Sequence, residues 1–453
     1  MNRLTIDLLR FIFVIPGLLC LLHITAHSQR PASANNQADA AALAELQEAV
    51  SLLQLGKPEE AEPILRRLIS KAPRNADAHN LLGTILDQRK QFKAAEREYR
   101  TALRLKPDAI SPLANLGVLL ARTGRSDEAI KAFESVLKKN PDHPQAILNL
   151  GLQFMTQADF ARAVPYLERA RQLGLDSYET RHNLGLALYH LKRYDEAASS
   201  LESAFALSPN SPDTAYYLGL VAWARGQDET AGEFWEKAIN LRPFFPAANF
   251  MLGEVFRKHA RLQSAQQFYE RALQQDSSQP VYYTRLGFAH IAQARFNLAL
   301  EVFQRAAQKF PELAETHYFV ALAARGAGDY KLARASLLRS LSINGKNADA
   351  LALLGAITAD QGDLVAAERF LRRAVALDPS HFNAHHDLGS LLVRNRRYEE
   401  ALPVLRHAAS LDARNPDVHY KLFMALTRLK RKDEADREFA IFKALEADSK
   451  PRN

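Results

Sequence analysis

The chain has 453 residues, of which 24% are charged and 47% hydrophobic, an ordinary balance for a folded protein in water. Its formal net charge of +8 is small for this length and does not by itself favour a nucleic-acid partner. Cys20 is the only cysteine, which excludes a disulfide framework; if the N-terminal segment that contains it is removed, a cysteine-ligated metal site is excluded as well.

Residues 1–28 have the pattern of a secretory signal peptide. Arg3 and Arg10 form a basic start, residues 11–22 are almost wholly apolar, and small residues at 26–28 suit cleavage. The apolar run is short for a membrane span, so we expect cleavage. The alternative is a retained N-terminal anchor, which would be the only attachment to a membrane. Either way, the pattern predicts export to the periplasm, the cell envelope or the medium.

A polar, alanine-rich stretch at residues 29–41 predicts a flexible linker after the leader. The rest of the chain, residues 42–449, repeats with a period of 34 residues and is followed by a short tail at 450–453. A fixed period of this length predicts stacked supersecondary units in one array rather than separate globular domains.

Two columns of small residues define the repeat. Counting places from the start of each unit, places 7 and 8 are a leucine-glycine pair in most units. Place 20 is alanine in all twelve: Ala61, Ala95, Ala129, Ala163, Ala197, Ala231, Ala265, Ala299, Ala333, Ala367, Ala401 and Ala435. Small residues at fixed places indicate that two segments cross closely there.

The unit at 178–211 shows what one repeat encodes. Its two halves each carry one apolar stripe at helical spacing, and a polar turn at 192–195 separates them. Pro209 and Pro212 end this unit and open the next, because proline breaks a helix interior but is tolerated in a first turn. Each unit is therefore predicted to be a helical hairpin that needs its neighbours to cover its apolar stripe.

These columns, with a large apolar residue at place 24 and frequent proline at place 32, resemble the tetratricopeptide repeat. The resemblance covers residues 42–449 and implies an all-α, right-handed superhelical solenoid of about twelve helix-turn-helix repeats. It also implies a protein-binding scaffold rather than an enzyme. The ninth unit departs from the pattern, with Ala321 and Gly345 in place of glycine and proline. The basic residues of a clamp for chaperone C-termini are missing from units two to four.

No catalytic or cofactor-binding motif accompanies the repeat, so we expect no enzyme activity and no cofactor. His381, His385 and His386 lie close together and suggest a metal site. However, His385 stands at place 4, where three other units also have histidine. A recurring place favours packing or a polar contact, and we expect no metal. Basic runs at 394–397 and 428–432 are expected to be solvated turns, the alternative being contacts with a polyanion.

The first binding candidate is an asparagine row. Asn115, Asn149 and Asn183 all stand at place 6, on the first helix of units three to five. The family resemblance places the first helices along the concave face, where a row of amides can hold a peptide backbone. It resembles the asparagine ladder in the repeat region of O-GlcNAc transferases, without that enzyme's catalytic domain. The alternative is that these amides bond within and between neighbouring helices.

The second candidate is an aromatic cluster in units five to seven with a basic border. It consists of Tyr189, Tyr216, Tyr217, Trp223, Phe250 and Arg257. Tyrosine and tryptophan beside arginine are typical of a binding hot spot. The alternative is that some rings pack between helices, with Tyr217 and Phe250 the first to do so.

The sequence thus predicts a non-enzymatic, extracytoplasmic scaffold that holds a protein or peptide partner in its groove. The alternative is a carbohydrate-binding accessory of envelope polysaccharide assembly or export, with the same aromatic rings stacking on a glycan. No nucleic-acid partner is expected.

Overall fold

The computed structural model describes residues 34–449, so the predicted signal peptide and tail lie outside the described part. Within it every regular element is an α-helix. The described residues divide into two compact units, with the boundary between Pro243 and Phe244. The boundary follows the sixth repeat rather than the irregular ninth one.

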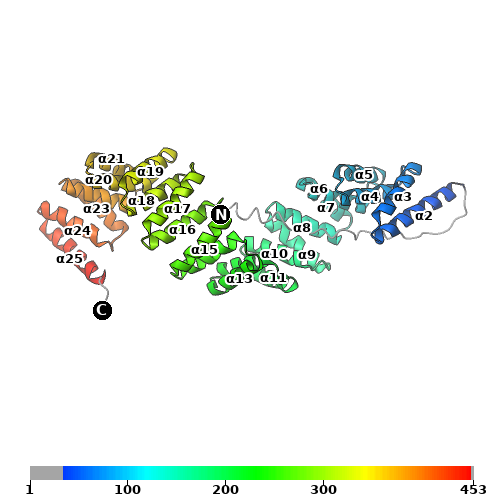
Figure 1. Cartoon of the computed structure of the whole chain (residues 1–453), viewed down its shortest axis with the longest axis horizontal. Coiled ribbons are helices and arrows are strands. Elements are labelled where there is room, and N and C mark those ends of the chain that lie inside the picture. Colours follow the sequence, from blue (N-terminus) through cyan, green and yellow to red (C-terminus); the bar gives the residue numbers. More distant parts are fainter. Residues whose placement is uncertain (1–33, 450–453) are drawn as a thin grey trace. The chain divides into compact units, whose positions relative to one another are not determined.

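In the first unit, consecutive helices pair into six hairpins that pack one after another (Figure 1). The helices are α2 (Ala34–Gln54), α3 (Pro58–Lys71), α4 (Ala76–Gln88), α5 (Phe92–Leu105), α6 (Ile110–Arg122), α7 (Ser126–Lys139), α8 (Pro144–Thr156), α9 (Phe160–Gln172), α10 (Tyr178–His190), α11 (Tyr194–Leu207), α12 (Pro212–Ala224) and α13 (Asp228–Leu241). Because α2 begins at Ala34, residues 34–41 are helical, although the sequence predicts a linker there.

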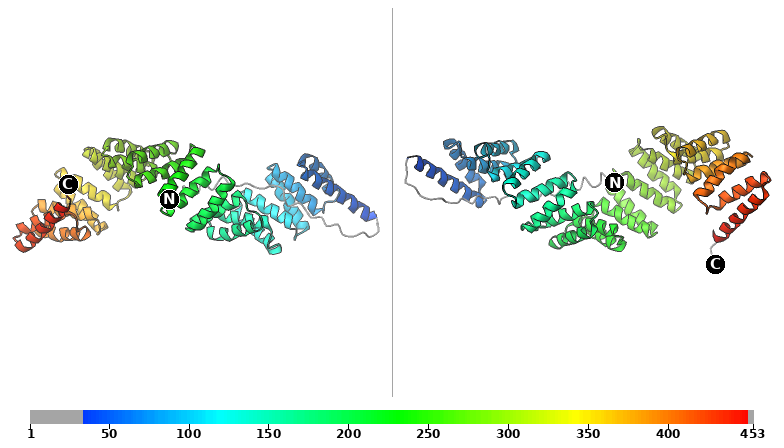
Figure 2. Two further views of the ribbon diagram at one scale, coloured as in Figure 1. Left: turned by 90° about the horizontal axis from the view of Figure 1, so that it is seen from below. Right: turned by 180° about the vertical axis from the view of Figure 1, so that it is seen from behind.

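The second unit repeats the arrangement with six more hairpins, visible from two other sides in Figure 2. Its helices are α14 (Pro246–Lys258), α15 (Leu262–Gln275), α16 (Pro280–Ala292), α17 (Phe296–Lys309), α18 (Ala314–Gly326), α19 (Tyr330–Ile343), α20 (Ala348–Asp360), α21 (Leu364–Leu377), α22 (Phe382–Arg394), α23 (Tyr398–Leu411), α24 (Pro416–Arg428) and α25 (Lys432–Ser449). The prediction of an all-α solenoid of helical repeats is confirmed.

Many of the helices begin where a side chain can cap the first turn or a proline fits into it. The hydroxyl of Ser211 accepts a hydrogen bond from the Thr214 backbone amide at 3.2 Å, and Pro212 occupies the first turn of α12. This arrangement satisfies one of the amides that a helix leaves unpaired at its N-terminus.

The small-residue columns mark the crossing of the two helices in each hairpin. The place-20 alanine is buried in all twelve hairpins. At place 8, a Cβ added to Gly253 would lie 2.6 Å from Cε1 of the buried Tyr269 ring at place 24, so glycine is required for the ring to pack. In the ninth hairpin Ala321 is itself buried, in one cluster with Leu337 at place 24.

Candidate functional site

The three asparagines of the predicted row do not share one environment. The Asn115 amide donates to the side-chain oxygen of Asn80 in the preceding hairpin at 3.0 Å. Asn183 is 7% exposed and donates to the Glu179 carbonyl of its own helix at 2.8 Å. Asn149 is half-buried and makes no side-chain hydrogen bond within residues 34–449. Two of the three amides therefore bond within the protein, as the alternative expects, and a ladder for a ligand stays a proposal.

Three tyrosines from α10 and α12 form a connected group, called here the tyrosine cluster: Tyr189, Tyr216 and Tyr217. The Tyr217 ring meets Tyr189 edge-on at 6.2 Å between centroids and Tyr216 edge-on at 5.6 Å. Tyr217 is 3% exposed, while the other two are half-buried. Burial raises the pKa of Tyr189, so its hydroxyl stays neutral near neutral pH. Tyr217 thus supports two rings that remain partly open to solvent.

Trp223 packs against Trp235, the large residue at place 24 of the same hairpin. The indole of Trp235, which is fully buried on α13, lies 6.0 Å from the Trp223 ring. Its Nε1–H donates to the backbone carbonyl of Tyr216 at 3.1 Å. Trp235 therefore packs against the Trp223 ring and bonds to the α12 backbone at Tyr216, and its place in the column of large residues at place 24 was the signal for its buried position.

Phe250 and Arg257 belong to the second unit. Phe250, on α14, packs its half-buried ring against Tyr269 and Tyr282, at centroid distances of 5.8 and 5.1 Å. Arg257 is exposed and pairs with Glu254 at 3.0 Å.

Glu254 is the centre of a small network in which Arg257 takes part. Its carboxylate also accepts from the Tyr269 hydroxyl at 2.5 Å and from Arg285 at 2.9 Å. Burial opposes the charge, but hydrogen bonds from Arg257 and Tyr269 outweigh it and lower the pKa of Glu254. Arg257 is thus partly committed to this structural carboxylate.

The place-4 histidines contact the backbone of the loops between hairpins. The Nδ1 of His79 lies 2.6 Å from Glu98, and its Nε2 lies 3.1 Å from the Pro73 carbonyl. His419 repeats both contacts, and His385 keeps the contact to the loop carbonyl at 2.9 Å. Among residues 34–449 no group of three or more potential ligands could hold a metal ion.

A groove in the second unit was not predicted. It has a volume of about 490 Å³ and is lined mainly by the first helices α18, α20, α22 and α24. Its charged residues are Arg325, Asp360, Asp387, Arg394 and Lys421. Arg394 starts one of the basic runs expected to be a solvated turn, whereas Arg397 in the same run is paired with Glu368 and Glu400.

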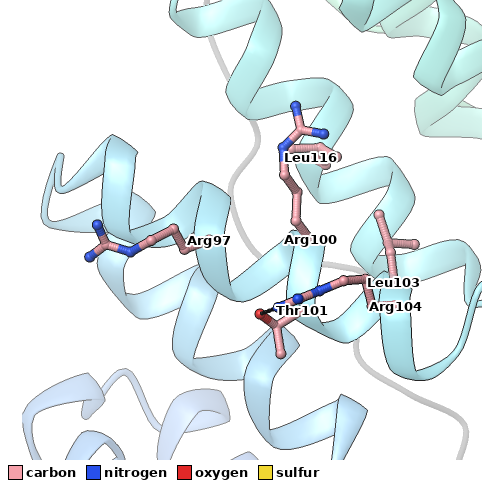
Figure 3. A pocket seen from close by; sticks show the side chains of 6 residues that line it. All are labelled: Arg97, Arg100, Thr101, Leu103, Arg104 and Leu116. Carbon is pink, nitrogen blue, oxygen red and sulfur yellow. Dashed lines mark hydrogen bonds between the residues drawn. The ribbon is translucent and has the colours of Figure 1, made fainter.

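A second cavity, of about 580 Å³, opens beside α5 in the first unit. Figure 3 shows that Arg97 and Arg100 point in different directions, while Arg104 bends toward Thr101. Arg100 is paired with Glu96 at 2.8 Å, and Arg104 donates to the Thr101 hydroxyl at 2.9 Å. The guanidinium groups do not converge on one ligand position.

None of the helices within residues 34–449 is long and apolar enough to cross a membrane.

Comparison with known proteins places the repeat in a family. A model described as tetratricopeptide repeat matches residues 46–110, 148–212, 182–239, 218–280, 284–348, 321–382 and 386–444. Two further models with the same description match residues 358–409 and 111–143.

One curated relative is the type IV pilus assembly protein PilF of Pseudomonas aeruginosa. It is 31% identical over 105 residues, which is 23% of this chain and 42% of PilF. The aligned part thus spans less than half of the relative's length.

Solved structures of similar proteins include the C-terminal part of a tetratricopeptide-repeat protein from Cytophaga hutchinsonii. It is 19% identical, with a TM-score of 0.48, covering 53% of this chain and 99% of that one. A structure of Pseudomonas aeruginosa PilF is 23% identical, with a TM-score of 0.42, covering 49% and 98%.

Proposed function

This chain belongs to the tetratricopeptide repeat family, and we propose that it is a non-enzymatic, extracytoplasmic scaffold that captures a segment of a partner protein. Members of this family bind protein or peptide partners. The finer proposal concerns where this chain does so, and it rests on the partly open rings Tyr189, Tyr216 and Trp223 on the first helices α10 and α12.

The arrangement of these rings suits a protein anchor. Aromatic side chains offer a large apolar area at a small cost in conformational entropy. Tyr217 and Trp235 hold the rings from the buried side, so little further ordering is needed on binding. Asn149, half-buried at place 6 of the preceding hairpin's α8, has an amide available for a peptide backbone.

Location and role are further parts of the proposal. The leader pattern in residues 1–28 supports export. Similarity to a protein named for type IV pilus assembly supports a role in assembling other proteins.

The test is affinity capture from envelope extract with the mature chain and with a Tyr216→Ala/Trp223→Ala variant, followed by mass spectrometry. We expect at least one protein to be retained by the first and lost by the second, since removing two anchors typically costs several kcal/mol of binding. Tyr330→Ala, which removes an exposed ring on α19, is the matched control and should retain the partner. Equal retention by the double variant would place the site elsewhere.

A carbohydrate partner is the second candidate, because partly exposed tyrosine and tryptophan rings can also stack on sugars. It predicts that soluble envelope glycans change the tryptophan fluorescence and that the change disappears in Trp223→Phe. The variant is informative because Trp223 and the buried Trp235 are the two tryptophans of the chain.

A further inference from the structure

The second-unit groove lies where one place of the repeat has small side chains in two neighbouring hairpins and large side chains in the hairpins on either side. Place 9 of the last four hairpins is Leu322, Ala356, Ser390 and Met424. The two small residues stand on α20 and α22, between the two large ones on α18 and α24. Ala356, Ser390 and Met424 all line the groove. A segment with side chains of its own can therefore enter between α18 and α24.

Two arginines and a lysine from three helices face this space. Arg325, on α18, is exposed and has no ion pair within the described chain. Arg394, on α22, donates through Nη1 to the Ala359 carbonyl on α20 at 3.2 Å, which holds its guanidinium across the groove. Lys421, on α24, has only a long contact of 3.8 Å to Asp417. These cations are positioned without being neutralised by close carboxylates.

The carboxylates of the groove do not cancel this charge. Asp387 lies 3.0 Å from Nδ1 of His386, and the opposite nitrogen of that imidazole lies 2.7 Å from Asp417. Asp387 and Asp417 raise the pKa of His386, so in mildly acidic solution its positive charge is shared with both. Asp360 is the remaining acid, exposed at the end of α20. The groove therefore favours an anionic ligand over a neutral or cationic one.

The floor of the groove offers one hydrogen bond. The Ser390 Oγ is buried and has no hydrogen-bond partner among the described residues. A buried hydroxyl without a partner carries an energetic cost that a ligand's amide or carbonyl can remove.

An aromatic pair joins α16 to α18, the helix that carries Arg325. Phe288 on α16 is 37% exposed and meets Phe319 on α18 edge-on at 5.2 Å. Phe319 and Arg325 stand at places 6 and 12, linked by Leu322 at place 9, so all three lie along one side of α18. A ligand can therefore place an apolar residue at this aromatic pair, before or after its acidic residues along the segment.

We propose that this groove binds an extended, acidic segment of a partner protein, with glutamate or aspartate side chains at Arg325, Arg394 and Lys421 and an apolar residue at Phe288 and Phe319. The proposal rests on the scaffold function above and adds a second site to it, with its own ligand chemistry. The two sites lie in different compact units.

Three synthetic twelve-residue peptides test it, each capped at both ends and carrying one phenylalanine in a glycine-serine background. They differ in having three glutamates, three glutamines or three lysines. We expect fluorescence anisotropy with the full mature chain to show binding of the glutamate peptide about tenfold tighter than the glutamine peptide. The lysine peptide should be weakest. In Arg325→Gln/Arg394→Gln the glutamate peptide should bind no better than the glutamine one.

Two further variants separate charge from shape. Ala356→Leu fills the groove without changing any charge and should also abolish binding. Arg339→Gln removes an exposed arginine on α19, outside the groove, and should leave the affinity unchanged. The proposal is overturned if no peptide binds, if the glutamine peptide binds as well as the glutamate one, or if Ala356→Leu has no effect. In those cases capture that depends on Tyr216 and Trp223 would still stand, so the two proposals fail separately.

Discussion

At the scale of single residues, the turns inside the hairpins carry a regular strain. Place 15 has a positive φ in every one of the twelve hairpins, and in seven of them the residue is not glycine. These seven are Lys90, Ala158, Lys192, Ala260, Ala294, Arg396 and Lys430. The left-handed conformation costs a residue with a Cβ about 1–2 kcal/mol.

This strain predicts that glycine is better at these turns. Ala260→Gly should raise the free energy of unfolding by about 0.5 kcal/mol, since relief of strain exceeds the entropy that glycine adds to the unfolded chain. Gly226→Ala, at the same place with φ 75°, should lower it by about 1 kcal/mol. Urea unfolding of the two variants checks the opposite signs, and equal signs would contradict the explanation.

We expect His182 to make the stability of the first unit depend on pH. It is 1% exposed, and its Nδ1 lies 2.9 Å from the Thr214 hydroxyl. Burial lowers its pKa from 6.5 to about 4. Between these values the unfolded chain binds a proton that the folded chain does not, so stability falls as the pH decreases through this window.

The whole pKa shift of His182 corresponds to about 3 kcal/mol of unfolding free energy. His182→Gln, which does not titrate, should therefore lose about 2–3 kcal/mol less stability than the wild type between pH 7 and pH 4.5. Chemical denaturation at both pH values measures this loss of stability. Comparing the two proteins cancels the contribution of the carboxylates, because these titrate in both. Parallel losses would show that His182 is not the responsible group.

At the scale of helices, the crossing inside each hairpin depends on two small residues and one large one. Gly185 and Ala197 leave room for Leu201, which is fully buried. Interiors are packed closely enough that one added side chain forces neighbours out of their preferred conformations.

Ala197→Leu should therefore destabilise the hairpin of α10 and α11 by about 1–3 kcal/mol. Ala206→Leu, on the exposed side of the same helix, is the control and should change stability by less than about 0.5 kcal/mol. Thermal unfolding followed by circular dichroism compares the two. An unchanged melting profile for Ala197→Leu would refute the crossing.

At the scale of the whole molecule, each repeat contacts only its neighbours, so the destabilisation caused by one substitution should be confined to adjacent hairpins. Leu371→Ala removes a fully buried side chain from α21 and should cost about 2–5 kcal/mol locally. We expect hydrogen exchange to accelerate in α20 to α23 and to remain unchanged in the first unit. Uniform acceleration over both units would mean that the chain unfolds as one cooperative body.

The sequence by itself determined the twelve hairpins, their crossings and the family. These follow from a strict period, because each unit meets the same local demands: a turn, a close approach of two helices and a covered apolar stripe. The same regularity predicted packing or polar contacts for the place-4 histidines, whereas inward packing of Tyr217 was only the alternative to its assignment as a binding residue.

Only the tertiary structure decided which side chains remain available. Asn115 bonds to Asn80 of the preceding hairpin, Asn183 bonds within its own helix, and Arg257 pairs with Glu254. The second-unit groove arises where Ala356 and Ser390 are smaller than the residues at the same place in the flanking hairpins. A periodic pattern reveals only the features that all units have in common. Whether a given polar or aromatic residue finds a partner depends on side-chain volume and charge in adjacent hairpins, which only packing brings together.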